Sequence, residues 1–203
     1  AKNIWIKQTN SGEAIEITKD DFRNENPIWS PNDEELAFFS TRGNQAGFWR
    51  IPILGGSPKL IAKIEDGSSV LRYWSKKDVI YYESKNELFS IDANTGENKQ
   101  ISDFTAKNIN ALSISISSDE QKVAYITIEG NKWNVWTKKV NEETPQKLFT
   151  TDSSIRNIAW HHDNHRIFFS QSVEGVFQAF VTDTKGTPPK QISNTERDCF
   201  VLD

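Results

Sequence analysis

The 203-residue sequence has no methionine and a single cysteine, Cys199. One cysteine excludes an internal disulfide, and we expect Cys199 to be a strand residue without chemistry. Because residue 1 is not methionine, we interpret the chain as a processed or excised piece, for which missing targeting signals say nothing about location. No apolar run approaches the length of a membrane span, so we expect no membrane contact by this segment.

An excess of basic charge is also missing. Lysine and arginine total 24 and aspartate and glutamate total 28, which leaves a formal net charge of -4. A nucleic-acid surface normally carries a basic stripe, and no cluster of lysine and arginine with interleaved aromatic residues occurs here. We therefore expect no nucleic-acid partner for this segment.

What the sequence does contain is a repeat of roughly 44 residues. In each copy an anchor residue is followed by a polar turn and then by an apolar strand. The anchors are Trp29, Trp74, Ile116 and Trp160. A period of this length filled with strands predicts an all-β β-propeller with one four-stranded antiparallel blade per repeat. Helical spacing of apolar residues is rare, so we expect almost no helix.

We divide the chain into four whole blades, a partial blade at residues 1–20 and a second at residues 195–203. The whole blades span about 21–63, 64–104, 105–151 and 152–194. Ile4–Ile6 and Ala14–Thr18 have the pattern of the third and fourth strands of a blade whose first half is missing. Cys199–Leu202 has the pattern of the first strand of another blade. The total is about five blades' worth of strands.

These incomplete ends leave two interpretations open. In a closed five-bladed propeller the two ends would share a blade that lacks its second strand. We favour a segment of a larger propeller of roughly six to eight blades. A blade buries its faces only against its neighbours, so an open arc would expose apolar surface. We expect that surface to be covered by the rest of the chain or by self-association of copies through the open blade faces.

The turns and strands of the first repeat resemble those of a known family. Pro27–Asp33, Leu36–Gly43 and Gly55–Leu60 are similar to the TolB-type, WD-like β-propeller repeat of bacteria. Its typical form is Pro-x-Trp-Ser-Pro-Asp-Gly, an apolar strand, Ser-x-Arg, and a Gly-Gly turn before Leu-Thr. The other repeats keep the strands and depart from the turns, with Lys76–Lys77 and Ser118–Asp119 where Pro-Asp is typical.

The resemblance covers nearly the whole chain and implies the propeller fold more firmly than an activity. It implies a non-catalytic module that binds a protein, a peptide or a small anionic ligand on its loop face, as a sensor or scaffold part of a larger bacterial protein. The alternative is the gating propeller of a prolyl-oligopeptidase-like or tricorn-like peptidase whose catalytic domain lies outside this chain. A more distant alternative is a metal-dependent lyase on acidic sugars. We expect no cofactor, and we favour a periplasmic or other extracytoplasmic location over a cytoplasmic one.

Four arginines are the candidate ligand-binding residues. They precede or lie within inner strands, or begin a hairpin loop: Arg23, Arg42, Arg72 and Arg156. Inner strands line the channel of a propeller, so converging guanidinium groups would make its mouth suitable for a carboxylate or an acidic peptide. The competing interpretation is four separate surface charges.

The three histidines of the chain fall within five residues, and imidazole is a common metal ligand. They are His161, His162 and His165. The repeat weakens the metal interpretation, because His161 and His162 stand where Ser30 and Pro31 stand in the ordinary turn between first and second strands. We therefore expect a solvated turn here.

Motifs for covalent catalysis and phosphate binding are missing. The sequence has no Gly-x-Ser-x-Gly elbow. Gly55–Gly56 lacks the Lys-Ser/Thr pair that follows a phosphate loop. The periodic tryptophans Trp29, Trp74 and Trp160 could stack on a sugar or a base, but their spacing predicts that each is buried in the gap between neighbouring blades. We expect this chain not to be an enzyme, and we leave the activity of its parent protein open.

Overall fold

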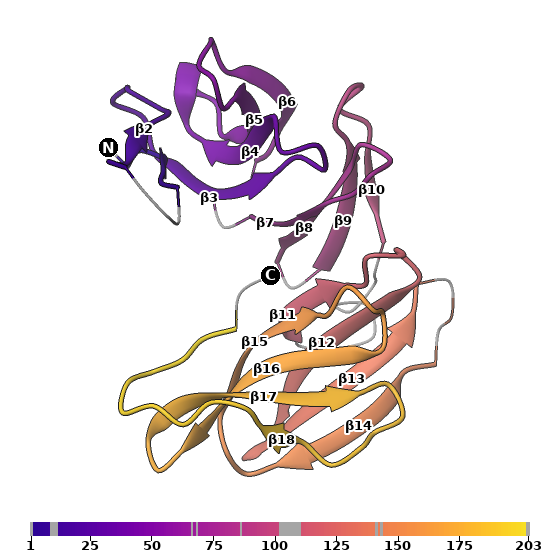
Figure 1. The fold of residues 1–203 in the computed structure, drawn as a ribbon. Coiled ribbons are helices and arrows are strands. Elements are labelled where there is room, and N and C mark those ends of the chain that lie inside the picture. Colours follow the sequence, from indigo (N-terminus) through magenta and orange to yellow (C-terminus); the bar gives the residue numbers. More distant parts are fainter. Residues whose placement is uncertain are drawn as a thin grey trace. The chain divides into compact units, whose positions relative to one another are not determined.

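The computed structural model describes residues 2–8, 12–65, 67, 69–85, 87–101, 111–140, 142 and 144–201. Over these residues the chain is all-β, with no α-helix and a single 3-10 turn, Arg42–Asn44. Among these residues we find no helical segment that could span a membrane. The predicted four-stranded antiparallel blades are confirmed, together with an additional two-stranded sheet (Figure 1).

Strands that are neighbours in sequence are also neighbours in each sheet. The two-stranded sheet, here called the half-blade, consists of β1 (Trp5–Ile6) and β2 (Ile15–Glu16). The first blade contains β3 (Asn24–Trp29), β4 (Glu35–Ser40), β5 (Gly47–Pro52) and β6 (Lys59–Lys63). The second contains β7 (Val70–Trp74), β8 (Val79–Ser84), β9 (Glu87–Asp92) and β10 (Asn98–Gln100).

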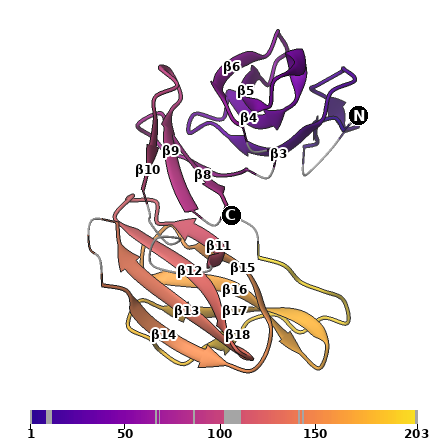
Figure 2. The ribbon, with the colours of Figure 1, turned by 180° about the vertical axis from the view of Figure 1, so that it is seen from behind.

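The other two blades have the same order (Figure 2). The third blade contains β11 (Ala111–Ile116), β12 (Lys122–Glu129), β13 (Lys132–Lys139) and β14 (Gln146–Thr151). The fourth contains β15 (Ile155–Trp160), β16 (Arg166–Val173), β17 (Val176–Asp183) and β18 (Lys190–Gln191). The expected strand at 199–202 does not form over residues 199–201, and Leu202 lies outside the described residues. The partial blade at 195–203 stays a prediction.

The turn between first and second strands has the same backbone in every blade. Four residues after each anchor the chain takes a positive φ, between 57° and 60°, at Asp33, Asp78, Glu120 and Asn164. Aspartate and asparagine tolerate this left-handed region better than most residues because their short side chains bond the local backbone. The shared geometry shows that the four anchors occupy equivalent positions.

The chain divides into two compact units, residues 1–85 with 89–100 and residues 86–88 with 101–203. In the first unit Phe48 of the first blade packs edge-on against Tyr82 of the second blade, with ring centroids 4.9 Å apart. In the second unit Phe149 of the third blade packs against Phe169 of the fourth at 5.1 Å. Apolar contact between blade faces therefore forms the core within each unit.

Both units repeat one close contact between a glycine turn and the outer strand of the preceding blade. Gly96 has φ +75°, and a Cβ atom there would lie 2.6 Å from the carbonyl oxygen of Ile61 in β6. Gly186 has φ +78°, and its Cβ would lie 3.3 Å from the carbonyl oxygen of Leu148 in β14. Glycine is needed at Gly96 for two reasons. A larger side chain would clash with the backbone carbonyl of Ile61, and any other residue would be strained at this positive φ.

We expect Gly96→Ala to lower the free energy of unfolding by about 2 to 4 kcal/mol, the combined cost of a left-handed alanine and of displacing the Ile61 carbonyl. Gly43→Ala is the matched control, because Gly43 has φ +65° with nothing within 4 Å of an added Cβ. It should lose about 1 kcal/mol. Urea unfolding followed by circular dichroism measures both, and equal losses would show that the close contact contributes nothing.

The tryptophan anchors are not all buried, and the prediction for Trp29 is wrong. Trp74 is 4% exposed, whereas Trp29 at the equivalent position is 46% exposed. Trp160 is partly buried, and its Nε1 donates to the carbonyl of Ser115 in the first strand of the preceding blade at 3.2 Å. Trp29 is exposed because the half-blade that precedes it has, in the described residues, no first or second strand to cover the indole.

Candidate functional site

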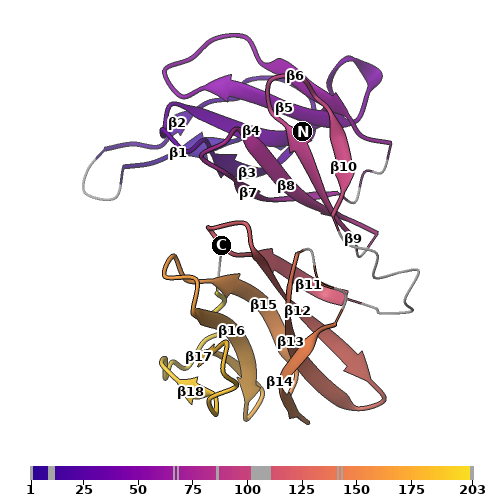
Figure 3. The same cartoon turned by 90° about the vertical axis from the view of Figure 1, so that its right-hand side faces the viewer.

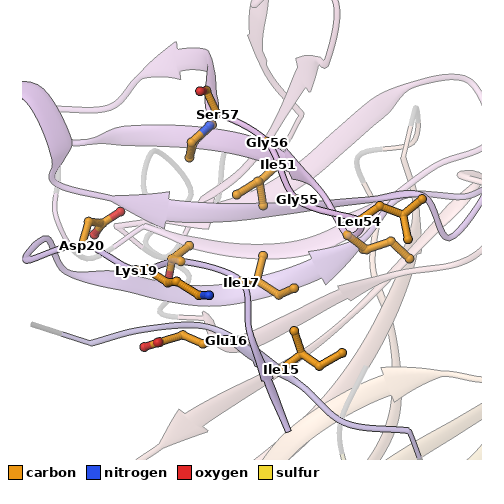
Figure 4. Close-up of a pocket in the computed structure, with 13 residues that line it drawn as sticks. Ile15, Glu16, Ile17, Lys19, Asp20, Ile51, Leu54, Gly55, Gly56 and Ser57 are labelled. Carbon is orange, nitrogen blue, oxygen red and sulfur yellow. The ribbon is translucent and has the colours of Figure 1, made fainter.

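A groove of about 500 Å³ separates the outer strand of the half-blade from the β5–β6 turn of the first blade (Figure 4). One wall is formed by residues 15–20, which contain β2 and the segment after it. The other wall is formed by residues 53–58, with Ile51 between them. Both walls belong to the first unit, so the groove is a property of that unit.

The groove exists because the β5–β6 turn does not close against the half-blade. In the second and fourth blades a turn glycine sits on the outer strand of the preceding blade. The equivalent glycines of the first blade do not, since a Cβ on Gly55 would meet nothing within 4 Å and one on Gly56 would meet only Pro52. Their φ angles of +98° and +142° are open to glycine and unfavourable for other residues.

The lining of the groove changes from apolar at one end to charged at the other. Ile15, Ile17, Ile51 and Leu54 gather at one end, as Figure 4 shows. Leu54 is 96% exposed and Ile15 is 64% exposed. Exposed aliphatic side chains on two facing walls are suited to receive an apolar side chain of another molecule.

Charged residues mark the other end of the groove. Glu16, Lys19 and Asp20 lie there (Figure 4). Both carboxylates, Glu16 and Asp20, already have partners. Glu16 accepts a hydrogen bond from Asn3 at 2.9 Å, and Asp20 Oδ2 lies 2.6 Å from Arg42 Nη2. Asn3 is uncharged, so Glu16 keeps its negative charge, and the charges of Glu16, Lys19, Asp20 and Arg42 sum to zero.

Arg42, one of the four predicted ligand-binding residues, lies in a polar network within the first unit. Besides Asp20, its Nη2 donates to Asn24 at 3.2 Å and its Nε donates to Ser40 at 3.3 Å. Its guanidinium also lies 5.2 Å from the centre of the Trp49 ring. The Arg42 side chain is 11% exposed, and burial lowers its pKa although Asp20 acts in the opposite direction. Arg42 of the first blade is thus bonded to Asp20, which lies in the segment between β2 and β3.

Two of the other predicted arginines also have carboxylate partners. Arg23 Nη2 lies 2.6 Å from Glu25, and this contact, with that of Lys2, lowers the pKa of Glu25 to about 2. Arg72 Nη2 lies 2.6 Å from Glu83. Arg156, in the second unit, lies with its guanidinium 4.8 Å from the centre of the Phe177 ring. Their convergence at a channel mouth stays a prediction, and pairing reduces the positive charge that Arg23, Arg42 and Arg72 can offer an anion.

The histidine turn has the geometry of the ordinary turn between first and second strands. His161 Nδ1 accepts a hydrogen bond from the backbone N–H of Asp163 at 3.2 Å, and Arg166 Nη2 lies 3.2 Å from both ring nitrogens of His161. Asp163 also accepts from the backbone N–H groups of His165 and Arg166, which holds its pKa below the ordinary value. Over the described part of the chain, no group of three histidine, cysteine, aspartate or glutamate residues could hold a metal ion.

Sequence reasoning did not identify the groove. Its strongest sequence signal is Leu54, an apolar residue in a Gly-Gly turn, where polar residues are usual. The other signal is the incomplete N-terminal blade, which the strand pattern did reveal. The pattern could not show that the β5–β6 turn stands apart from this half-blade.

No protein-family model matches the chain. A curated protein named "Uncharacterized peptidase YuxL", from Bacillus subtilis (strain 168), is 35% identical over 68 residues, which is 33% of this chain and 10% of that protein. The solved structure of TolB from Acinetobacter baumannii has a TM-score of 0.75 at 13% identity, over 97% of this chain and 50% of that chain. Oligogalacturonate lyase from Vibrio parahaemolyticus has a TM-score of 0.70 at 9% identity, over 95% of this chain and 59% of that chain.

At these identities the solved structures show the fold alone. The chain spans 50% and 59% of the two solved structures and matches 10% of the curated relative. A TolB protein, a lyase and a protein named as a peptidase all resemble it, so the fold does not choose an activity. The resemblance to the TolB-type repeat is confirmed at the level of fold: the chain has the four-stranded antiparallel blades of a β-propeller, a fold that it shares with the TolB structure.

Proposed function

We propose that this chain is a non-catalytic β-propeller module that binds a protein or peptide, as a sensor or scaffold part of a larger bacterial protein. The observation that carries the proposal is the groove between the half-blade and the first blade. Its two walls present Ile15 and Leu54 to solvent, at 64% and 96% exposure. Rigid blades hold the walls apart, and loops held on such a scaffold are common binding surfaces.

The expected ligand is an extended segment that inserts an apolar side chain between Ile15 and Leu54. Its backbone would pass the charged end, where Lys19 and the paired carboxylates can contact polar groups. An apolar anchor surrounded by polar contacts is the usual composition of a transient interface. An extracytoplasmic location for this binding stays a prediction.

A displayed library of random peptides tests the proposal. We expect the 203-residue chain to enrich peptides that share an apolar anchor, and we expect Leu54→Asp and Ile15→Asp to weaken their binding by roughly tenfold or more, because each places a charge in the apolar end. Ile192→Asp is the matched control, since Ile192 is a 50% exposed isoleucine of the second unit. Enrichment that all three variants retain would overturn the proposal, as would a lack of enrichment over an unrelated protein.

A second candidate is the gating propeller of a peptidase. It is favoured by the 35% identity over 68 residues to a protein named as a peptidase. On this proposal the catalytic domain lies outside the chain. The coding sequence on both sides of residues 1–203 decides between the two, because a serine peptidase would encode a Gly-x-Ser-x-Gly elbow there. A DNA-binding or kinase domain would instead support the sensor proposal.

A further inference from the structure

A cavity of about 430 Å³ lies between the first and second blades of the first unit, beside the turns that connect their first and second strands. Figure 3 shows β7 of the second blade next to β3 of the first. The cavity is lined by Ser30–Asn32, Glu35 and Arg50 of the first blade and by Trp74, Lys76, Asp78 and Asn94 of the second. Its lining is mostly polar, and it shares no residue with the groove of the proposed function.

One hydrogen-bond donor at this cavity has no acceptor in the described part of the chain. Trp74 is 4% exposed, and its indole Nε1 is buried without a hydrogen-bond partner. At the equivalent position of the fourth blade, Trp160 Nε1 donates to the carbonyl oxygen of Ser115. A buried donor without a partner costs free energy. An oxygen atom of a ligand that accepts from Trp74 would therefore be stabilising.

The equivalent place between the third and fourth blades is closed by hydrogen bonds. Ser118 Oγ donates to Asn164 Oδ1 at 2.9 Å, and Lys122 Nζ donates to the carbonyl oxygen of Asn164 at 3.2 Å. The Lys122 ammonium also lies 5.9 Å from the centre of the Trp160 ring. In the second unit an ammonium group thus lies close to both the anchor tryptophan and the turn of the fourth blade.

The first unit cannot make these bonds, because different residues occupy the same repeat positions. Pro31 replaces the serine and has no side-chain donor. Asp78 stands where Asn164 stands, four residues after the anchor. Glu35 stands where Lys122 stands, since the carbonyl of each accepts from the backbone N–H of the serine that follows the anchor position. Two carboxylates therefore line the cavity where the second unit has an ammonium and an amide, and a nearby cation would stabilise both of them.

The charged side chains of the cavity are only partly paired. Glu35 Oε2 lies 3.5 Å from Arg50 Nη1, and Asp78 Oδ2 accepts a hydrogen bond from the uncharged Asn94 at 3.4 Å. Lys76 is exposed and has no ion-pair partner among the described residues. The charges of the two carboxylates and the two basic side chains sum to zero. The cavity is therefore suited to a ligand that carries both an ammonium and a carboxylate.

We propose that this cavity binds a free α-amino acid as its zwitterion. The ammonium of the ligand lies beside Glu35 and Asp78, as the ammonium of Lys122 lies beside the equivalent turn of the second unit. The carboxylate of the ligand accepts from the indole N–H of Trp74 and pairs with Lys76. The inference goes beyond the proposed function and does not depend on it, because the two sites share no residue.

Three small molecules separate the contributions of the two charges: L-alanine, L-alanine amide and propionate. The amide keeps the ammonium and a carbonyl oxygen without the negative charge, as the N-terminus of a peptide does, and propionate has the carboxylate alone. We expect L-alanine to shift the NMR signal of the Trp74 indole N–H, which Trp74→Phe identifies by its loss. L-Alanine should bind roughly tenfold more tightly than either analogue.

Two outcomes of this titration would overturn the proposal. One is the lack of any shift of the Trp74 indole signal with L-alanine. The other is equal binding of an analogue, which would assign the cavity to the N-terminus of a peptide if the analogue is the amide, or to a simple carboxylate if it is propionate.

Two substitutions test the charges with residues that the repeat itself uses at the same positions. Lys76→Ser copies Ser118 of the third blade, and it should weaken L-alanine binding by roughly tenfold and leave L-alanine amide binding unchanged. Asp78→Asn copies Asn164 of the fourth blade and keeps a residue that tolerates the φ of 58°. It should weaken binding of both compounds. Equal weakening of the two compounds by Lys76→Ser would overturn the role of Lys76 as the partner of the carboxylate.

Lys77→Ser and Glu120→Asn are the matched controls. Lys77 is adjacent to Lys76 and does not line the cavity. Glu120 occupies the position of Asp78 in the turn of the third blade, with φ 60°. Both variants should leave L-alanine binding unchanged, and a control that weakens binding as much as its counterpart would show that the cavity is not the site.

Discussion

Replacing Trp74 with alanine is expected to lower the free energy of unfolding by about 3 to 5 kcal/mol, as for other large buried aromatic residues. Trp74 is 4% exposed and belongs to the core shared by the first and second blades, with Phe48, Tyr82 and Ile91. Its removal leaves a cavity that the surrounding strands cannot fill, because their own side chains are held by packing on both faces.

The control is the same substitution at the equivalent repeat position. Trp29→Ala should lose less than about 1 kcal/mol, because the indole is 46% exposed and buries less apolar area. Urea unfolding followed by circular dichroism measures both variants. A loss at Trp29 as large as that at Trp74 would mean that Trp29 is covered in solution by a second copy or by another part of the chain, and dilution would separate these explanations.

Replacing Arg42 with alanine is expected to cost about 3 kcal/mol of unfolding free energy. The Arg42 side chain is 11% exposed, and its loss removes the cation that pairs with Asp20 Oδ2 and one hydrogen-bond donor each from Asn24 and Ser40. Asp20 Oδ1 keeps the bond that it accepts from Asn24 Nδ2. An unpaired carboxylate in such a place costs more than the pair itself contributes. The double variant Asp20→Ala, Arg42→Ala should therefore lose less unfolding free energy than the sum of the losses of the two single variants.

The matched control is Lys132→Ala, which removes one partner of an ion pair with Asp152. Those side chains are 56% and 76% exposed, so the expected loss is below about 1 kcal/mol. If Arg42→Ala is as stable as Lys132→Ala, Arg42 is not a structural residue and its predicted role in ligand binding becomes the better explanation. Thermal and urea unfolding measure the two variants, with a ligand titration as the second readout.

The fold could be predicted from the sequence because the sequence repeats. Anchors near every 44th residue, each followed by a turn and an apolar strand, predicted the four blades and their antiparallel strand order. The positive φ at Asp33, Asp78, Glu120 and Asn164 shows why the pattern is reliable, since each turn is determined by residues close in sequence. The expected turn at His161 and His162 has the same local origin.

The candidate sites depended on contacts that no local pattern contains. Trp29 and Trp74 occupy equivalent positions in sequence and differ in exposure because their preceding blades differ. Arg42 is hydrogen-bonded to a carboxylate 22 residues away. The groove at Leu54 exists because one turn stands apart from the half-blade, while the turn of Gly96 closes against Ile61.

The amino-acid sequence by itself determined the strands of the four whole blades, how the strands are ordered in each blade and where the turns fall, although the strand expected at 199–202 does not form over residues 199–201. Strand and turn formation depends on side-chain alternation and on the torsion preferences of neighbouring residues, which are properties of short segments. The tertiary structure alone decided which tryptophan is buried, which arginine is paired and which turn stands apart from the strand before it. Exposure, charge pairing and turn contacts depend on what another segment places beside a residue, and that is a property of packing between blades.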